Sequence, residues 1–271
     1  IRMIQMKMPG VTIYQSTLMK TTSTLIETPD CLIVVDPGWL PDEIATIRRD
    51  VEIVRRDRPL YVVYTHAHFD HILGAYAFTD AIVIASKPFI DVDRQEALKA
   101  VQDFNDEFYI DSPVLFPDVT HVIHESETIL TIGQTKLIFF MTPGHEATHL
   151  SFIVMPLHLL VCGDYASDVE IPLIEHDSSE YLTTLELLES FIYEYEVKLL
   201  IPGHGHICDV RTEMIERLHQ SYDYILALRA GKESDWAPSW QTTPFMKRLH
   251  EKNKRQVKQE HEERLARRHY D

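Results

Sequence analysis

Residues 65–71 constrain this chain more than any other stretch, because four metal-ligand side chains lie within six positions of it. They follow a five-residue apolar run of the kind that forms a buried strand. On extended backbone His66 and His68 point the same way, since side chains repeat every two residues. The following turn can bring Asp70 and His71 towards them. The spacing predicts a site for two nearby metal ions and differs from the i, i+4 histidine pair of helical metal motifs.

Composition limits the class of protein. The 271 residues allow one sizeable domain, and 45% apolar with 25% charged residues is typical of a soluble globular protein. A formal net charge of -16 repels polyanions, which disfavours nucleic acid as a partner. The three cysteines form no disulfide framework, and we see neither a membrane span nor a signal peptide. We expect a cytoplasmic protein with a small-molecule substrate and no membrane partner; a homodimer stays open.

Hydrophobic periodicity predicts an α/β protein in which two β-hairpins precede alternating strands and helices. We expect strands at residues 3–8, 11–16, 23–27, 31–35, 60–65, 81–85, 121–124, 127–130, 135–141, 149–155, 158–162 and 197–201. Helices are expected at residues 41–56, 72–78, 88–101 and 181–194, from a cap at Asp209 onward, and at 247–268. Composition changes near residue 231, which predicts a domain at 1–230 and a helical extension at 231–271. The charge of the last helix is typical of a solvated surface helix, with anion binding as the alternative.

Three further apolar strands end in a candidate ligand, and each of these ligands follows a glycine. They are His145, Asp164 and His204. Glycine allows the chain to bend close to a site. Strand ends along one rim of a sheet can gather such ligands. Asp36 also ends a strand, and it is either a turn-forming residue or an acceptor that orients a ligand.

Residues 103–120 break the alternation of strands and helices. Aromatic residues alternate with acidic ones there, which favours a lid or substrate wall over an aromatic plug under a loop. The wall residues are Phe104, Phe108, Tyr109 and Phe116. Two residues near the candidate ligands have open roles. Tyr165 either donates a hydrogen bond to a developing oxyanion or packs, and His149 is expected to hydrogen-bond to a ligand rather than be one.

The motif His-x-His-x-Asp-His, followed by Gly-His, Gly-Asp and Pro-Gly-His in that order, resembles the metallo-β-lactamase-fold hydrolase superfamily over about residues 10–230. The branch with glyoxalase II and lactonases is the most similar, because true β-lactamases have a cysteine or no protein ligand at the position of Asp164. The resemblance implies a four-layer αββα sandwich with a C-terminal helical extension. It also implies two sets of metal ligands joined by a bridge: His66, His68 and His145 for the first metal, Asp70, His71 and His204 for the second, and Asp164 bridging both.

The implied activity is that of a dinuclear-metal-dependent hydrolase, in which a metal-bridging hydroxide cleaves an ester-type bond such as a thioester or lactone. Asp70 is then the candidate to move a proton. The donor set suits two divalent ions, with zinc favoured and iron or manganese as alternatives. The alternative activities are a mononuclear iron persulfide dioxygenase on the same fold and a phosphodiesterase or RNA-processing nuclease. A non-catalytic binding module is a third reading, which the intact ligand set disfavours.

Overall fold

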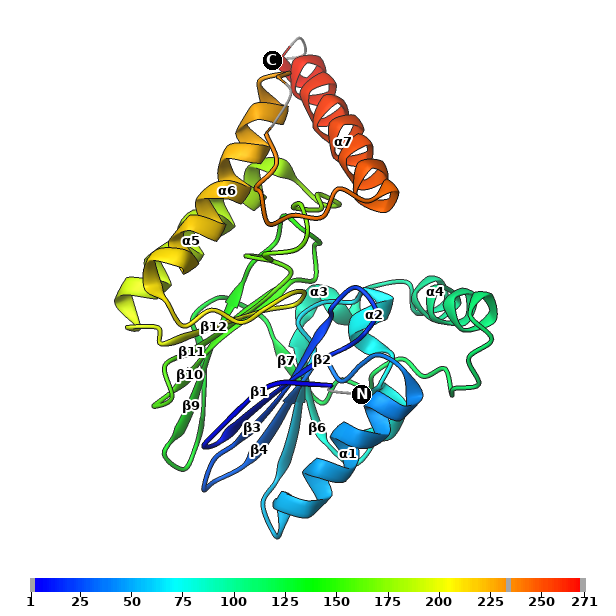
Figure 1. Ribbon diagram of the computed structural model, residues 1–271, viewed down its shortest axis with the longest axis vertical. Helices are drawn as coiled ribbons and strands as arrows, with labels where there is room; N and C mark the ends of the chain where they lie inside the picture. The colour runs from blue at the N-terminus through cyan, green and yellow to red at the C-terminus, as the bar shows by residue number, and fades with distance from the viewer. Residues whose placement is uncertain (1–2, 233–234, 269–271) are drawn as a thin grey trace. The chain divides into compact units, whose positions relative to one another are not determined.

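The computed structural model describes residues 3–232 and 235–268. The first predicted domain begins with residues 1–2 and the second ends with residues 269–271, and these five residues lie outside the described ranges. The described chain forms two compact units. The first comprises the residues up to 141 together with 148–157, and the second comprises 142–147 together with the residues from 158 onward. Each is described separately below, and Figure 1 labels most of their helices and strands. Within the described residues, no helix is sufficiently long and apolar to cross a bilayer.

A seven-stranded sheet with the order β1-β2-β3-β4-β5-β6-β7 forms the centre of the first unit. Its first four strands are antiparallel and β4 to β7 are parallel. The strands are β1 (Ile4–Met8), β2 (Val11–Gln15), β3 (Thr22–Glu27), β4 (Leu32–Val35), β5 (Leu60–Val63), β6 (Ile82–Ser86) and β7 (His121–Ile123). Parallel strands covered on both faces need continuous apolar sequence, and all four residues of β4 are buried.

Helix α1 (Pro41–Arg55) packs on this sheet through one apolar stripe. Ile44, Ile47 and Val51 recur at helical spacing, are buried, and join one core cluster with residues of β4 and β5. The predicted helix at 72–78 is instead two short pieces, α2 (Phe69–Ile72) and the 3-10 turn η1 (Ala75–Ala77).

The predicted helix at 88–101 is also divided in the structure, into α3 (Lys87–Ile90) and α4 (Arg94–Glu107). The division occurs where Asp93 caps α4 by accepting from the backbone of Gln95 and Glu96. Helix α4 therefore takes up the first part of the segment 103–120 that was expected to be irregular.

Three antiparallel strands complete the first unit, β8 (Thr128–Ile132), β9 (Thr135–Met141) and β10 (Leu150–Met155). The β8–β9 turn is tied to the β3–β4 turn by Asp30, which accepts from the Gln134 backbone N–H at 2.8 Å and from the Thr135 hydroxyl at 3.3 Å. These strands agree with the alternation read from the sequence.

The second unit contains two parallel strands, β11 (Leu159–Gly163) and β12 (Leu199–Pro202), and three long helices. Helix α5 (Ser178–Glu194) contacts β11 and α6 (Arg211–Arg229), and α6 contacts α7 (Pro244–Arg268). The cap of α6 is Val210, so the predicted cap at Asp209 is wrong by one residue.

Helix α7 is charged but is not solvated all round, contrary to the sequence-based interpretation. A stripe at three- and four-residue spacing is buried against the second unit, and its residues are Met246, His250, Asn253, Val257 and Glu260. The sequence did not reveal this stripe, because three of its five members are polar and charged residues lie between them. The boundary predicted at residue 230 stays a prediction.

Gly74 is required by a close approach of the backbone. A Cβ atom there would lie 1.9 Å from the carbonyl oxygen of Pro37. We expect Gly74→Ala to lower the free energy of unfolding by about 2 kcal/mol or more, since overpacking against a fixed backbone costs ~1–3 kcal/mol and occasionally more. Chemical denaturation followed by circular dichroism measures this change.

Gly231→Ala is the matched control, because Gly231 has a φ of +66° and no atom within 4 Å of a Cβ. It should cost only about 1–2 kcal/mol of backbone strain. Equal losses in the two variants would contradict the steric explanation for Gly74.

Candidate metal centre

Strand β5 delivers the histidine cluster of the first unit. After Val63 the chain belongs to no helix or strand up to His68, whose backbone is extended, and α2 then carries Asp70 and His71. Nε2 of His66 lies 3.1 Å from Nδ1 of His68, and Nε2 of His71 lies 3.3 Å from Oδ2 of Asp70. His66, Asp70 and His71 are at most 5% exposed. The predicted juxtaposition of these four side chains is therefore present in the structure.

Asp36 orients two of these histidines. One of its carboxylate oxygens accepts from the Thr65 backbone N–H at 2.8 Å, and the other accepts from the Thr65 hydroxyl at 2.6 Å and faces Nδ1 of His71 at 2.9 Å. Because Thr65 gives its hydroxyl proton to Asp36, its oxygen can accept from Nδ1 of His66, 3.0 Å away. Both imidazoles then carry their proton on Nδ1, which leaves the Nε2 lone pairs for a metal.

The position of Asp36 follows from the turn that ends β4. Its backbone N–H donates to Val63 on β5, and its carbonyl accepts from Ser23 at 2.7 Å. Its φ of 43° is left-handed, a conformation that aspartate tolerates better than most residues. The carboxylate is 2% exposed and thus held at a fixed place in the first unit.

The second unit supplies the other three candidate ligands. Oδ2 of Asp164 lies 3.3 Å from Nε2 of His145 and 3.3 Å from Nε2 of His204. Glycines allow this approach, since a Cβ at Gly203 would lie 1.9 Å from the Asp164 carboxylate. Nδ1 of His145 lies 2.8 Å from the carbonyl oxygen of Leu173, which again leaves Nε2 as the ligand atom.

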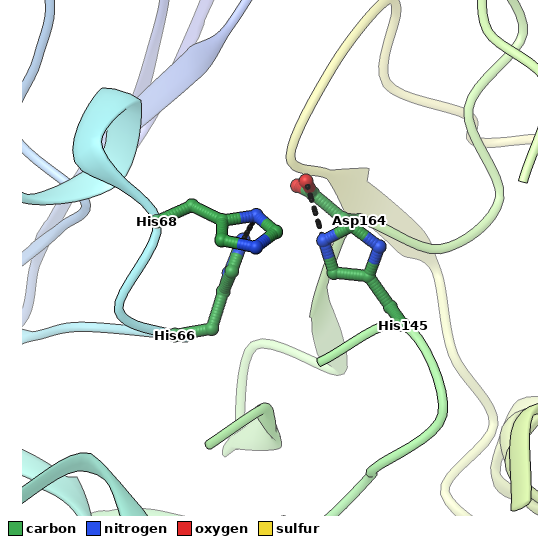
Figure 2. Close-up of side chains that lie close together, drawn as sticks. All are labelled: His66, His68, His145 and Asp164. Carbon is green, nitrogen blue, oxygen red and sulfur yellow. Dashed lines mark hydrogen bonds and ion pairs between the residues drawn. The ribbon is translucent and has the colours of Figure 1, made fainter. Parts of the chain in front are cut away.

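The structure places all seven predicted ligands in two groups. Within each group the ligand atoms all lie within 4.8 Å of one another, and Figure 2 shows the side chains of the larger group. The larger group is His66, His68, His145 and Asp164, and the smaller is Asp70, His71 and His204.

The separations within the pairs fit a metal ion. An ion bound at about 2.0–2.1 Å with tetrahedral angles holds its ligand atoms about 3.3–3.4 Å apart. Three of the four separations measured above are 3.3 Å and the fourth is 3.1 Å. Buried imidazole and carboxylate groups are also the donor set that zinc, iron and manganese accept. These clusters can therefore hold metal ions.

Tyr165 holds the loop that carries His145. It is fully buried, and its hydroxyl lies 2.8 Å from the Thr142 carbonyl and 2.9 Å from the Pro143 carbonyl and accepts from the His145 backbone N–H at 3.0 Å. Burial raises the pKa of its phenol. Of the two roles that the sequence left open, these contacts favour packing. Donation of a hydrogen bond to an oxyanion stays a prediction.

Other predicted residues occupy varied places. The ring of His149 is 1% exposed and stacks on His66 with centroids 4.9 Å apart.

Phe116 is 6% exposed and packs on Phe89 in the core, whereas Phe108 is 52% exposed. Phe104 packs against Trp39, Phe69 and Phe108, and Tyr109 is 96% exposed. Their role as a substrate wall stays a prediction.

Three residues at the site escaped sequence reasoning. Thr65 links Asp36 to His66, Leu173 holds His145 through its carbonyl, and the Glu170 carboxylate lies 3.9 Å from Nδ1 of His204. The position of Thr65 beside His66 was a usable signal. Leu173 acts through its backbone, and Glu170 is 34 residues before His204 in the sequence, so neither carries a local pattern.

Cys162 is a core residue and not one of the candidate ligands. It is fully buried, and its thiol contacts the carbonyls of Tyr165 and Ile201 at 3.3 and 3.4 Å. Burial, and then the charge of Asp164, raise the pKa of the thiol. A thiol that resists ionisation is a poor metal ligand.

Comparison with known families decides the membership of the chain. The family model of the metallo-beta-lactamase superfamily matches residues 17–204. The chain belongs to the metallo-β-lactamase superfamily. The match includes all seven candidate ligands. It confirms the predicted fold class and, at the level of the family, the prediction of a metal-dependent hydrolase.

Relatives within the metallo-β-lactamase superfamily are distant. A beta-lactamase-like protein 2 homolog of Caenorhabditis elegans is 26% identical over 225 residues, which are 80% of this chain and 68% of that protein. The acyl-coenzyme A thioesterase MBLAC2 of Bos taurus is 25% identical over 61% of this chain. The N-acyl homoserine lactonase of Bacillus cereus is 25% identical over 60%. The chain spans 62% of the length of each of these two enzymes.

A solved structure of the same fold is the inverting sec-alkylsulfatase Pisa1 from Pseudomonas sp. The TM-score is 0.69 at 16% identity, and the match covers 84% of this chain and 42% of the alkylsulfatase. This likeness shows the metallo-β-lactamase fold alone.

Asp36 gives the first test of the centre. We expect Asp36→Asn to weaken zinc binding by about 10- to 100-fold, because Asn has one accepting oxygen and its NH2 group would face either the Thr65 backbone N–H or the Thr65 hydroxyl and Nδ1 of His71. Competition with a chromophoric chelator measures the affinity. The control is Asp91→Asn, which removes an exposed carboxylate paired with Lys87 and should leave the affinity unchanged. Equal affinities in all three proteins would show that Asp36 does not act on the metal ligands.

Proposed function

We propose that this chain is a dinuclear-metal-dependent hydrolase that cleaves an ester-type bond, a thioester or a lactone, in a small molecule. The observation that carries the proposal is the place of Asp164. One oxygen of its carboxylate is 3.3 Å from His145 and 3.3 Å from His204, two histidines that belong to different ligand groups. An acidic ligand shared in this way offsets the repulsion between two cations.

In the proposed assignment the two ions have separate ligands. His66, His68 and His145 would hold the first, Asp70, His71 and His204 would hold the second, and Asp164 would be shared by both. Two divalent cations bound there would supply Lewis-acid polarisation of a substrate oxygen and would acidify water near neutral pH. Zinc fits this set best because it favours imidazole with carboxylate.

The residues of the chain prepare the site before a substrate arrives. Asp36 and Leu173 fix the tautomers of His66, His71 and His145, so no ring needs to turn or lose a proton from Nδ1 during turnover. Asp70 is 5% exposed, and its Oδ2 lies beside Nε2 of His71. A carboxylate at this place can accept and return a proton, which is the role we assign to Asp70.

Two observations support a particular class of substrate: the names of two relatives and the net charge of the chain. A relative is an acyl-coenzyme A thioesterase and another is an N-acyl homoserine lactonase, so the bonds their names give are a thioester and a lactone. A net charge of -16 opposes RNA or DNA as a substrate. These points support thioesters and lactones over phosphodiesters.

Metal analysis tests the number of ions. Protein purified without chelator should contain close to two equivalents of zinc or manganese. One equivalent of iron, with oxygen consumption on a persulfide, would replace the hydrolase by a mononuclear dioxygenase. A panel of acyl thioesters, N-acyl lactones and bis-p-nitrophenyl phosphate should give turnover with the first two classes.

Removal of one ligand tests the assignment of the first metal. We expect His68→Ala to lose about one equivalent of metal and to reduce kcat by at least about 100-fold, because its Nδ1 is one of the three histidine ligands. His206→Ala is the control, since that ring is largely exposed and pairs with Asp168 at 2.8 Å. Unchanged turnover and metal content in His68→Ala would refute the assignment.

A further inference from the structure

Helix α7 contains an asparagine whose burial needs an explanation. Asn253 is 0% exposed, in a helix whose other charged and polar residues are mostly at the surface. Burying an amide without hydrogen-bond partners costs several kcal/mol on the most apolar transfer scales and about 1–3 kcal/mol in proteins. An apolar residue at this position would pack without that cost. The hydrogen-bond partners of the amide therefore show what its burial does.

The amide of Asn253 binds both sides of a single residue. Its nitrogen donates to the carbonyl of Pro172 at 2.5 Å, and its oxygen accepts from the backbone N–H of Ile174 at 2.9 Å. The nitrogen also donates to the hydroxyl of Tyr224 on α6 at 3.0 Å. Asn253 thus hydrogen-bonds to the peptide groups immediately before and after Leu173.

Leu173 is the residue whose carbonyl oxygen lies 2.8 Å from Nδ1 of His145. Residues 171–174 belong to no helix or strand, so no ladder of backbone hydrogen bonds fixes the direction of that carbonyl. Buried backbone outside regular structure needs side-chain partners. Asn253 supplies them on both sides of Leu173.

We propose that Asn253 is a positioning residue, which acts through the Leu173 carbonyl to hold the imidazole of His145 with Nε2 directed at the first metal. The proposal rests on the proposed function in one respect, the assignment of His145 as a metal ligand. It gives helix α7 a role in the centre although no residue of α7 is among the proposed ligands.

Two further residues of α7, Gln256 and Glu260, hydrogen-bond to residues 176–178, which follow Leu173 in the chain. Glu260 accepts from the backbone N–H of Ser178 at 2.9 Å and from its hydroxyl, and Gln256 donates to the carbonyl of His176 at 3.1 Å. Asn253, Gln256 and Glu260 are three and four residues apart, so they lie along one side of the helix. Of these three residues, Asn253 is the one with hydrogen bonds to the peptide groups that flank Leu173, which distinguishes it from a general anchor.

The test compares Asn253→Ala with Gln256→Ala in the full chain. In metal-free protein labelled with ¹⁵N in histidine, Nδ1–H of His145 should give a slowly exchanging signal, because it is buried and hydrogen-bonded. We expect Asn253→Ala to lose or broaden this signal and Gln256→Ala to keep it. With zinc, Asn253→Ala should weaken the affinity of one site by about 10-fold, within the range for residues that orient metal ligands.

The result that overturns the proposal is a folded Asn253→Ala variant with the His145 signal intact and zinc affinity within about twofold of the unsubstituted chain. An equal effect in Gln256→Ala also overturns it, because α7 would then act only as a general anchor. If Asn253→Ala does not fold, Tyr224→Phe removes one partner of the Asn253 amide and should broaden the same signal; an unchanged signal is again a refutation.

The metal-free measurement separates this proposal from the proposed function. A chain that binds two metals but cleaves neither thioesters nor lactones would refute the substrate class and leave the role of Asn253 intact. A chain in which His145 binds no metal would keep the signal change but lose the affinity change, and that outcome would overturn the proposal in its link to the centre.

Discussion

The carboxylate of Asp36 is the contact on which the histidine cluster of the first unit depends. It binds Thr65 twice, faces His71, and through Thr65 sets the proton position on His66. Two imidazoles are thus prepared by one buried charge. The backbone of Asp36 is in turn held by the Val63 carbonyl of β5 and the Ser23 hydroxyl of β3, so the sheet determines the position of the ring nitrogens through a few short hydrogen bonds.

The second unit achieves the same result by other means. A backbone carbonyl, rather than a carboxylate, fixes His145, and that carbonyl is held by an amide from a distant helix. Both arrangements leave Nε2 as the ligand atom. The two arrangements differ in charge, since a carboxylate adds negative charge near bound cations and a carbonyl does not. Within the proposed ligand set the negative charge comes from Asp70 and Asp164, and the carboxylates of Asp36 and Glu170 lie behind His71 and His204.

The cluster at 66–71 could be predicted because strand periodicity and local spacing put its members side by side. The three later ligands were found by a recurring pattern of apolar strand, glycine and ligand, and by resemblance to a family. Asn253 and Leu173 could not be found in this way. A hydrogen bond from a side chain to backbone leaves no residue-type pattern at the accepting end, and Asn253 is surrounded in sequence by lysines and arginines that indicate a solvated helix. The division of the helix at 88–101 was missed because an aspartate cap was read as an interior residue.

The buried polar stripe of α7 has a practical consequence for protein engineering. A terminal helix rich in lysine and arginine is a usual target for trimming, for charge redesign to improve crystallisation, or for replacement by a fusion partner. Under the proposal for Asn253, such changes would loosen residues 172–177 and the start of α5, and the effect would reach His145 rather than appear as poor solubility. Redesign of this helix should therefore alter its exposed side only.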